Sequence, residues 1–406
     1  MTDGVREVLS VQLKTVFRKL IGYCEANGWA GHDPYDALNS RVLEGIALFD
    51  SRIPRIAFTQ LLKRSPINLR PALGIAKTEN PKGLCLFLSA LTKAADAGIT
   101  AYESQRAHLV GRLEALRSTD QRYWCWGYNF PWQTRTVLVP LGVPNLVCTV
   151  FVAGALLDAY ERDANSKCLE MATSAAEYIV DKLYWSGSGS AAGFGYPLPT
   201  VRNQVHNANL LAAALLCRVS RYTGERKFLA RALKVARYSV SRQNGNGSWY
   251  YGEAESQRFV DNVHTGFNLC ALQTIRRECQ SDEFEQNVRR GYHYYRKHFY
   301  LENGSVRYFN NKTYPIDIHA VAQSIITPVM LNDTSQSSVD LAASVFCWAL
   351  RHMWDPRGYF YYRVLRSNTI RIPYMRWSEA WMAVAIVQLL CSLVHQPVSP
   401  SELLHK

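Results

Sequence analysis

The chain has 406 residues, of which 48% are hydrophobic and 19% are charged. This composition excludes a disordered chain and allows a large buried core. The net charge of +13 favours an anionic partner, but the basic residues are scattered along the chain, which argues against nucleic acid.

Ten cysteines are present, and no two of them form a CxxC pair. Several lie in apolar runs, where a free cysteine behaves as a small hydrophobic residue. The first residues of the chain are polar, and no apolar run reaches membrane-spanning length. We therefore expect a reduced, cytoplasmic protein without stable membrane insertion.

The first predicted helix covers residues 8–24, where apolar residues recur at helical spacing. A loop at residues 28–36 follows and carries Asp33 and Asp36. Residues 37–49 have helical character again, so we expect a second helix there.

Residues 50–120 are the least regular part of the chain. Prolines such as Pro54, Pro66 and Pro81 interrupt the helical pattern and mark boundaries between elements. We expect extra helices in this region, with residues 102–116 as the outer helix of the second repeat unit.

From about residue 120, one pattern recurs: a helix, a loop rich in Trp, Tyr and Gly, a polar cluster, and an apolar helix. The interval from Asn207 to Asn262 is 55 residues, that from Asn262 to Asp317 is 55, and that from Asp317 to Arg376 is 59. Counting the loop at residues 29–36 as the first, there are six units. The predicted apolar helices after the polar clusters are residues 149–160, 210–219, 269–275, 321–330 and 380–394.

Six helical hairpins of this kind predict a closed ring, in which apolar helices form the inner wall and amphipathic helices cover them. The fold class is therefore all-α: an (α/α)6 toroid over residues 1–406 as a single domain, with short hairpin-like loops on one face. An open solenoid is the alternative.

In such a ring the loops before the inner helices meet at one face, so the polar clusters should converge on one cavity. Helix capping alone would explain Asp33, Asp261 or Asp317, and a single histidine is usually a core residue. The candidate catalytic carboxylates are Asp36, Asp261, Asp317 and Glu379. The candidate substrate-binding residues are Asp33, Tyr35, Trp126, Tyr128, Asn145, His206, Asn207, Asn262, His264, His319, Arg376, Trp377 and Trp381.

Local motifs for metals and cofactors are missing. The sequence has no HxH, HExxH or CxxC spacing, no glycine-rich phosphate loop and no GxSxG elbow. A zinc site built from the three histidines and two aspartates would rest on the fold alone. We predict no metal and no cofactor.

Five segments stand out: Gly31–Ser40, residues 126–132 with their Trp-Gly-Tyr start, Phe259–Phe267, Ile316–Gln323 and Arg376–Met382. Together they resemble bacterial exopolysaccharide biosynthesis proteins of the six-hairpin glycosidase-like superfamily. The resemblance implies an (α/α)6 toroid and a role in making or trimming a surface polysaccharide. It does not imply one reaction, because that superfamily includes hydrolases, lyases and sugar epimerases.

Three functions remain open. A glycoside hydrolase needs two carboxylates across the cavity; Glu379, between two tryptophans, would have a raised pKa and serve as the acid, with Asp261 or Asp36 as the base. A lyase or epimerase acting on a uronate glycan would instead use Asn, His, Arg and Tyr side chains. A glycan-binding protein without chemistry is the third. In each case the expected partner is an oligo- or polysaccharide, and the basic charge favours an anionic one.

Overall fold

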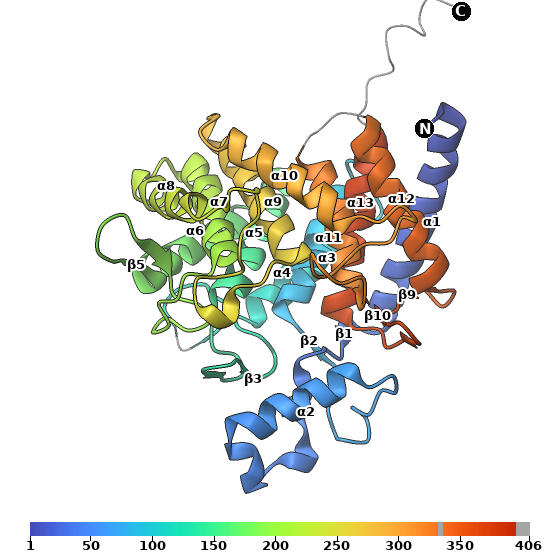
Figure 1. The fold of residues 1–406 in the computed structure, drawn as a ribbon, viewed down its shortest axis with the longest axis horizontal. Helices are drawn as coiled ribbons and strands as arrows, with labels where there is room; N and C mark the ends of the chain where they lie inside the picture. The colour runs from blue at the N-terminus through green and yellow to red at the C-terminus, as the bar shows by residue number, and fades with distance from the viewer. Residues whose placement is uncertain (120, 332–335, 395–406) are drawn as a thin grey trace, which may run out of the picture.

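The computed structural model describes residues 1–119, 121–331 and 336–394. Six helices form the inner wall of a closed ring (Figure 1). Each packs against the next, and the last packs against the first, so the solenoid alternative is wrong. The inner helices are α3 (Pro81–Ala94), α5 (Leu146–Asp163), α7 (His206–Thr223), α9 (Asn262–Cys279), α11 (Ile318–Met330) and α13 (Ala380–Val394).

Six outer helices cover this wall, and the all-α (α/α)6 toroid predicted from the repeats is confirmed. They are α1 (Asp3–Ala26), α4 (Glu103–Ala115), α6 (Ser166–Tyr178), α8 (Arg226–Ser241), α10 (Glu285–Phe299) and α12 (Gln336–Met353).

The first unit differs from the prediction. Residues 36–50 form three short 3-10 turns, η1 (Asp36–Asn39), η2 (Arg41–Leu43) and η3 (Ala47–Asp50), and not the expected second helix. The first inner helix is α3, inside the irregular region. Its start carries a recognisable signal: Asn80 accepts hydrogen bonds from the N–H groups of Lys82 and Gly83, and Pro81 occupies the first helical position.

A small lobe projects from the ring beside this first unit (Figure 1). It consists of the three turns, α2 (Arg52–Arg64) and the chain that returns to β2 (Thr78–Glu79). Among the described residues its buried core is made of Ala37, Leu62 and Ile75. Within the lobe Arg70 pairs with Asp36 at 2.6 Å, and Nη1 of Arg70 anchors the lobe to the ring by donating to the hydroxyl of Tyr374 at 2.8 Å.

Short antiparallel strands lie in the connecting loops, as the Tyr-rich loops predict. The two-stranded pairs are β1 (Ala30–Gly31) with β2 (Thr78–Glu79), β3 (Trp132–Gln133) with β4 (Leu138–Val139), β5 (Tyr184–Ser186) with β6 (Ala192–Phe194), and β8 (Trp354–Asp355) with β9 (Tyr359–Phe360). β10 (Arg363–Val364) lies between β7 (Ile316–Asp317) and β11 (Thr369–Ile370).

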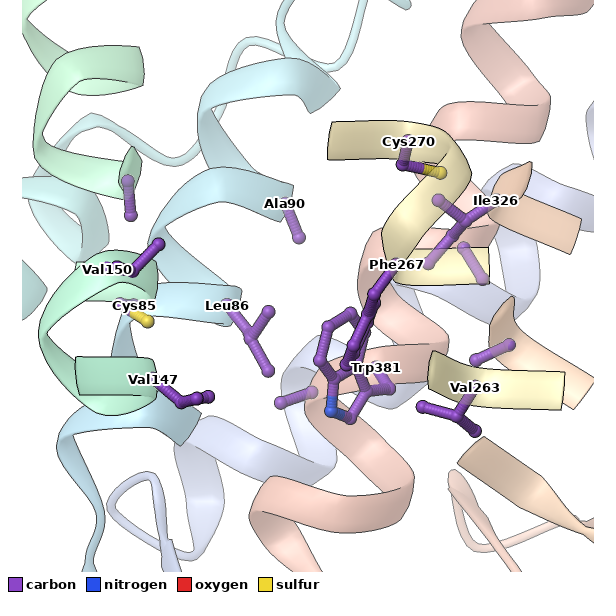
Figure 2. Close-up of a cluster of buried hydrophobic side chains, with 14 of the residues drawn as sticks. Cys85, Leu86, Ala90, Val147, Val150, Val263, Phe267, Cys270, Ile326 and Trp381 are labelled. Carbon is purple, nitrogen blue, oxygen red and sulfur yellow. The ribbon is translucent and has the colours of Figure 1, made fainter. Parts of the chain in front are cut away.

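Side chains from the inner helices fill the middle of the ring. Figure 2 shows Phe267 of α9 and Trp381 of α13 side by side, facing Leu86 of α3 and Val147 of α5. The two rings lie 5.4 Å apart between centroids. Large aromatic side chains close the axis of the ring, and the space inside is divided into hollows at its two ends.

The last inner helix corrects one expectation from the sequence. Together with the preceding π-turn η6 (Met375–Glu379), α13 makes a 20-residue apolar helix that is long enough to cross a membrane, with a mean hydropathy of 1.5. In the 18-residue stretch of this helix that has this hydropathy, 61% of the residues are buried, because the helix forms part of the inner wall. A buried core helix of a protein can be as long and as apolar as a helix that spans a membrane.

Candidate functional site

The loops that precede the inner helices surround a cavity of about 450 Å³. Its wall includes two histidines, an aspartate, a buried lysine and a set of aromatic rings. The lining residues predicted from the sequence are Tyr35, Tyr128, Asn207, Asp261, His264, His319, Arg376 and Trp377.

A second hollow, of about 600 Å³, lies around the opposite ends of the inner helices. Trp381 lines this hollow and not the first. The carboxylates there, Asp158 and Glu161, are both ion-paired with Arg218. The first cavity brings together two histidines, a carboxylate and polar atoms of His319 and Asn207 that have no hydrogen-bond partner among the described residues, and we therefore regard it as the candidate site.

Asp261 and His264 form a hydrogen-bonded pair at the start of α9. Oδ1 of Asp261 accepts from the backbone N–H of His264 and so caps the helix. Oδ2 lies 2.6 Å from Nδ1 of His264. Because a carboxylate only accepts, it holds the proton on Nδ1 and leaves the lone pair on Nε2. The side chain of His264 is 28% exposed, so this nitrogen can reach a ligand.

His319, at the start of α11, is the second histidine of the wall. Its ring stacks on Trp381 at 4.5 Å and meets the edge of Trp377 at 4.7 Å. Neither ring nitrogen has a hydrogen-bond partner in the described part of the chain. Burial, reinforced by the nearby cations Lys82 and Arg376, lowers the pKa of His319 well below its usual value. The ring is therefore neutral at pH 7, with one nitrogen able to donate and the other to accept.

Both histidines lie near one aromatic side chain, Phe267. The centroid of Phe267 lies 6.2 Å from that of His264 and 5.9 Å from that of His319. Asn207 also lines the cavity, and its Oδ1 has no partner among the described residues. A small polar ligand on this wall would meet two imidazoles and an amide.

Three of the four candidate catalytic carboxylates do not line the cavity, so their expected convergence is wrong. Asp36 bonds to Arg70, and burial raises its pKa to about 6. Asp317 accepts from Arg363 at 2.5 Å and from Trp377 Nε1 at 2.9 Å. These carboxylates hold the loops together and leave Asp261 alone on the wall.

Glu379 is the third, and it is fully buried behind the wall. Its Oε2 accepts from the backbone N–H of Phe360 at 2.9 Å, and its Oε1 has no partner in the residues described. Burial raises the pKa of Glu379 well above its usual value, in the direction expected from the sequence. The group does not line the cavity.

Glu379 should therefore lower the free energy of unfolding at neutral pH. A carboxyl whose pKa is raised on folding binds more protons when folded, so stability falls as the pH rises above about 4.5. Glu379→Gln is expected to be more stable than the wild type at pH 8, by on the order of 1 kcal/mol, and equal to it near pH 4. Urea unfolding at both pH values measures this. The exposed Glu302→Gln is the control, and a gain that is independent of pH would contradict the expectation.

The remaining predicted residues have structural roles. Asn145 caps α5, and the indole N–H of Trp126 donates to the carbonyl of Leu113. Asn262 bonds to Tyr295 and Ser324 inside the wall. His206 is buried off the cavity, and burial lowers its pKa to about 4. These residues were predicted to line the site because of their positions in the repeat units. The position in a repeat does not determine the direction in which a side chain points.

Asp33 also lies behind the wall, where it orients Arg376. Its two oxygens accept from Nε and Nη2 of Arg376 at 2.6 and 2.7 Å. The pair joins the first loop of the chain to the start of α13 and so closes the ring. Arg376 in turn lies 5.2 Å from the ring of Tyr128 and 5.2 Å from that of Trp377.

Sequence reasoning missed several residues of the wall. The most important is Lys82, in the first turn of α3. The others include aromatic residues of the loops and of α9, among them Tyr196, Tyr251, Phe259, Phe267 and Tyr308. Lys82 could have been found from its place two residues after the helix-capping Asn80, had α3 been recognised as an inner helix.

The comparisons with known proteins agree on the fold. The structure is similar to a sugar epimerase from a ruminal bacterium (TM-score 0.60, 11% identity, 80% of this chain and 91% of that one). It is similar to the cellobiose 2-epimerase of Bacillus thermoamylovorans (TM-score 0.61, 12% identity, 77% of this chain and 87% of that one). It is also similar to a GH76 alpha-mannanase of Bacteroides thetaiotaomicron (TM-score 0.61, 12% identity, 82% of this chain and 90% of that one).

No family model matches the sequence, and no curated protein matches it either. At 11–12% identity the likeness to these three structures is one of fold. Proteins named as epimerases and as a mannanase share this fold, so the fold does not determine the reaction. The reaction has to be argued from the residues of the cavity.

Proposed function

We propose that this protein is a carbohydrate-active enzyme that moves a proton to and from a sugar carbon, as an epimerase, isomerase or lyase does. The observation that carries the proposal is the wall with two histidines and a single carboxylate. His264 is oriented as a base by Asp261, and His319 is neutral and unpaired. Two such groups can take a proton from one side of a carbon and return one from another.

Hydrolysis by paired carboxylates has less support. A glycosidase places two carboxyl groups about 5–10 Å apart across the scissile bond. Asp261 is the one carboxylate among the residues that line the cavity, and it is bonded to His264. Asp36, Asp317 and Glu379 are buried, each with a hydrogen-bond partner.

A saccharide substrate is supported by the shape and lining of the cavity. Aromatic rings from several loops give flat apolar surfaces on which a sugar can stack, and Asn207, the histidines and Arg376 supply hydrogen bonds. The similar structures include proteins named as epimerases and as a mannanase. We further propose that the substrate belongs to exopolysaccharide synthesis, which the resemblance of five sequence segments supports. We propose the cytoplasm as the location, which the ten free cysteines favour.

Isotope exchange tests the proton transfer. The protein is incubated in D2O with a panel of neutral and acidic oligosaccharides, and carbon-bound deuterium is followed by mass spectrometry and NMR. We expect deuterium at one sugar carbon together with an epimer or an isomer, or, for a lyase, an unsaturated product without carbon-bound deuterium. New reducing ends with neither carbon-bound deuterium nor an unsaturated product would contradict the proposal and favour hydrolysis.

A further inference from the structure

Lys82 is a buried basic residue without an acidic ion-pair partner among the described residues. Its side chain belongs to the wall of the cavity, and the residue is 4% exposed. Within the described chain no carboxylate forms an ion pair with its ammonium group. Its Nζ lies over aromatic faces, at 4.2 Å from the centroid of Phe151, 5.5 Å from that of Trp381 and 5.8 Å from that of Phe267.

The charge balance of the cavity wall makes this cation unusual. The charged side chains of the wall are Lys82, Arg135, Arg376 and Asp261. Arg376 is neutralised by Asp33, and Asp261 is bonded to His264. Arg135 lies at the exposed rim, where it donates to the carbonyl of Ser256. Lys82 therefore has no ion-pair partner among the described residues of the wall, and its charged form is costly there unless an anion pairs with it.

Lys82 lies beside the proposed proton-transfer group. Trp381 and Phe267, which pack against its ammonium group, also pack against the ring of His319. Abstraction of a proton from carbon develops negative charge on the adjacent carbonyl or carboxyl oxygens. A cation beside His319 on this wall is where such charge can be neutralised.

We propose that Lys82 binds the carboxylate of a uronic acid residue, so that the substrate is an acidic glycan. The inference rests on the proposed function and names its substrate. One ammonium group matches the single charge of a carboxylate, whereas a phosphate dianion would require more donors than this buried part of the wall offers. The aromatic faces around Nζ suit the ring that carries the carboxylate.

The step balances without a co-reactant. His264 Nε2 takes the proton from the carbon next to the carboxylate, and the electron pair of the broken C–H bond moves onto the carboxylate oxygens beside Lys82. For epimerisation, the neutral His319 takes a proton from water on one ring nitrogen as it gives the proton of the other nitrogen to the opposite face of the carbon, and His264 returns its proton to water. For elimination, the electron pair expels the oxygen substituent on the next carbon, which leaves as an alcohol with the proton that His264 holds.

The protonation of Lys82 is coupled to this anion. Burial, and secondarily the nearby Arg376, lowers the pKa of Lys82 to about 7. The other groups that act on it electrostatically are His319, Cys85, Cys148 and Asp33. A bound carboxylate favours the ammonium form, so the acidic ligand should bind with uptake of a proton near pH 7.5.

Matched sugars test the role of Lys82. Oligosaccharides containing hexuronate are compared with the same compounds after reduction of each carboxyl group to an alcohol. Isothermal calorimetry at pH 7.5 in two buffers of different ionisation enthalpy gives affinity and proton uptake. We expect at least one acidic compound to bind about 10- to 100-fold more tightly than its reduced form.

Three variants decide whether Lys82 causes that preference. Lys82→Met keeps the packing on Phe151 and should abolish both the preference and the proton uptake. Lys82→Arg keeps the charge and should retain part of the preference. Lys93→Met, further along the same helix in the opposite hollow, should change neither. Thermal melting checks the fold, and Lys82→Met should melt no lower than the wild type because it removes a buried charge.

The possible outcomes separate the two proposals. Equal binding of acidic and reduced sugars, or a preference that survives in Lys82→Met, overturns the role of Lys82. Deuterium exchange into neutral sugars without any carboxylate preference would leave the proton-transfer function standing and remove the acidic substrate. A carboxylate preference with neither exchange nor an unsaturated product would keep the Lys82 site and contradict the reaction.

Discussion

Replacing His264 by glutamine is expected to lower kcat by about 10²–10⁴-fold, while the protein remains folded. Glutamine can fill much of the same space but cannot take a proton from carbon near neutral pH. The loss should appear in kcat and in deuterium exchange more than in KM. His293→Gln, on the exposed face of α10, is the matched control and should be neutral.

Asp261→Asn tests how that histidine is oriented. Asparagine keeps the oxygen that caps α9, but its amide donates where the carboxylate accepted from Nδ1. The imidazole would then place its proton on Nε2, which is the wrong tautomer for a base. We expect a comparable loss of kcat and a changed pH profile, with the melting temperature nearly unchanged. Full activity in Asp261→Asn would contradict the assignment of His264 as the base.

Removing Asp33 is expected to destabilise the protein by about 3–5 kcal/mol. Asp33→Ala leaves the guanidinium of Arg376 buried without its carboxylate, because both side chains are 5% exposed. The pair joins segments 343 residues apart, so its loss also loosens the contact between the first loop and the last inner helix. Urea unfolding of the two proteins at pH 7 measures the difference.

An ion pair nearer the surface provides the control for that measurement. Asp163 bonds to Arg106 in the same bidentate way, but the aspartate is 40% exposed. Asp163→Ala should therefore cost only about 0–1 kcal/mol. In the double variant Asp33→Ala with Arg376→Met, part of the stability should return because no buried charge is left unpaired. Equal losses for Asp33 and Asp163 would show that burial does not govern these pairs.

The repeat pattern predicted most of the inner wall correctly. The starts of α5, α9 and α11 agree with the polar clusters because Asn145, Asp261 and Asp317 each cap their helix, a local interaction that sequence reveals. The first unit was predicted wrongly. Its loop at Asp33 resembles the others, but it leads into 3-10 turns and a lobe before the inner helix begins at Pro81.

The same caps show why the site was harder to predict than the fold. Asp261 and Asp317 hold equivalent positions and both accept from a backbone N–H in the first turn of the next helix. Their remaining carboxylate oxygens differ: Asp261 turns to His264, whereas Asp317 is held by Arg363 from a distant strand. No local signal in the sequence distinguishes the two.

The sequence by itself determined the number of hairpins, their order and most of their inner helices, because helical periodicity and capping depend on residues a few positions apart. Only the tertiary structure decided which polar groups face the cavity. Ring closure brings Arg376 to Asp33 and Lys82 close to Trp381, across intervals of about 300 residues or more. Those contacts bury some charges in pairs and leave one, on Lys82, for a ligand to neutralise.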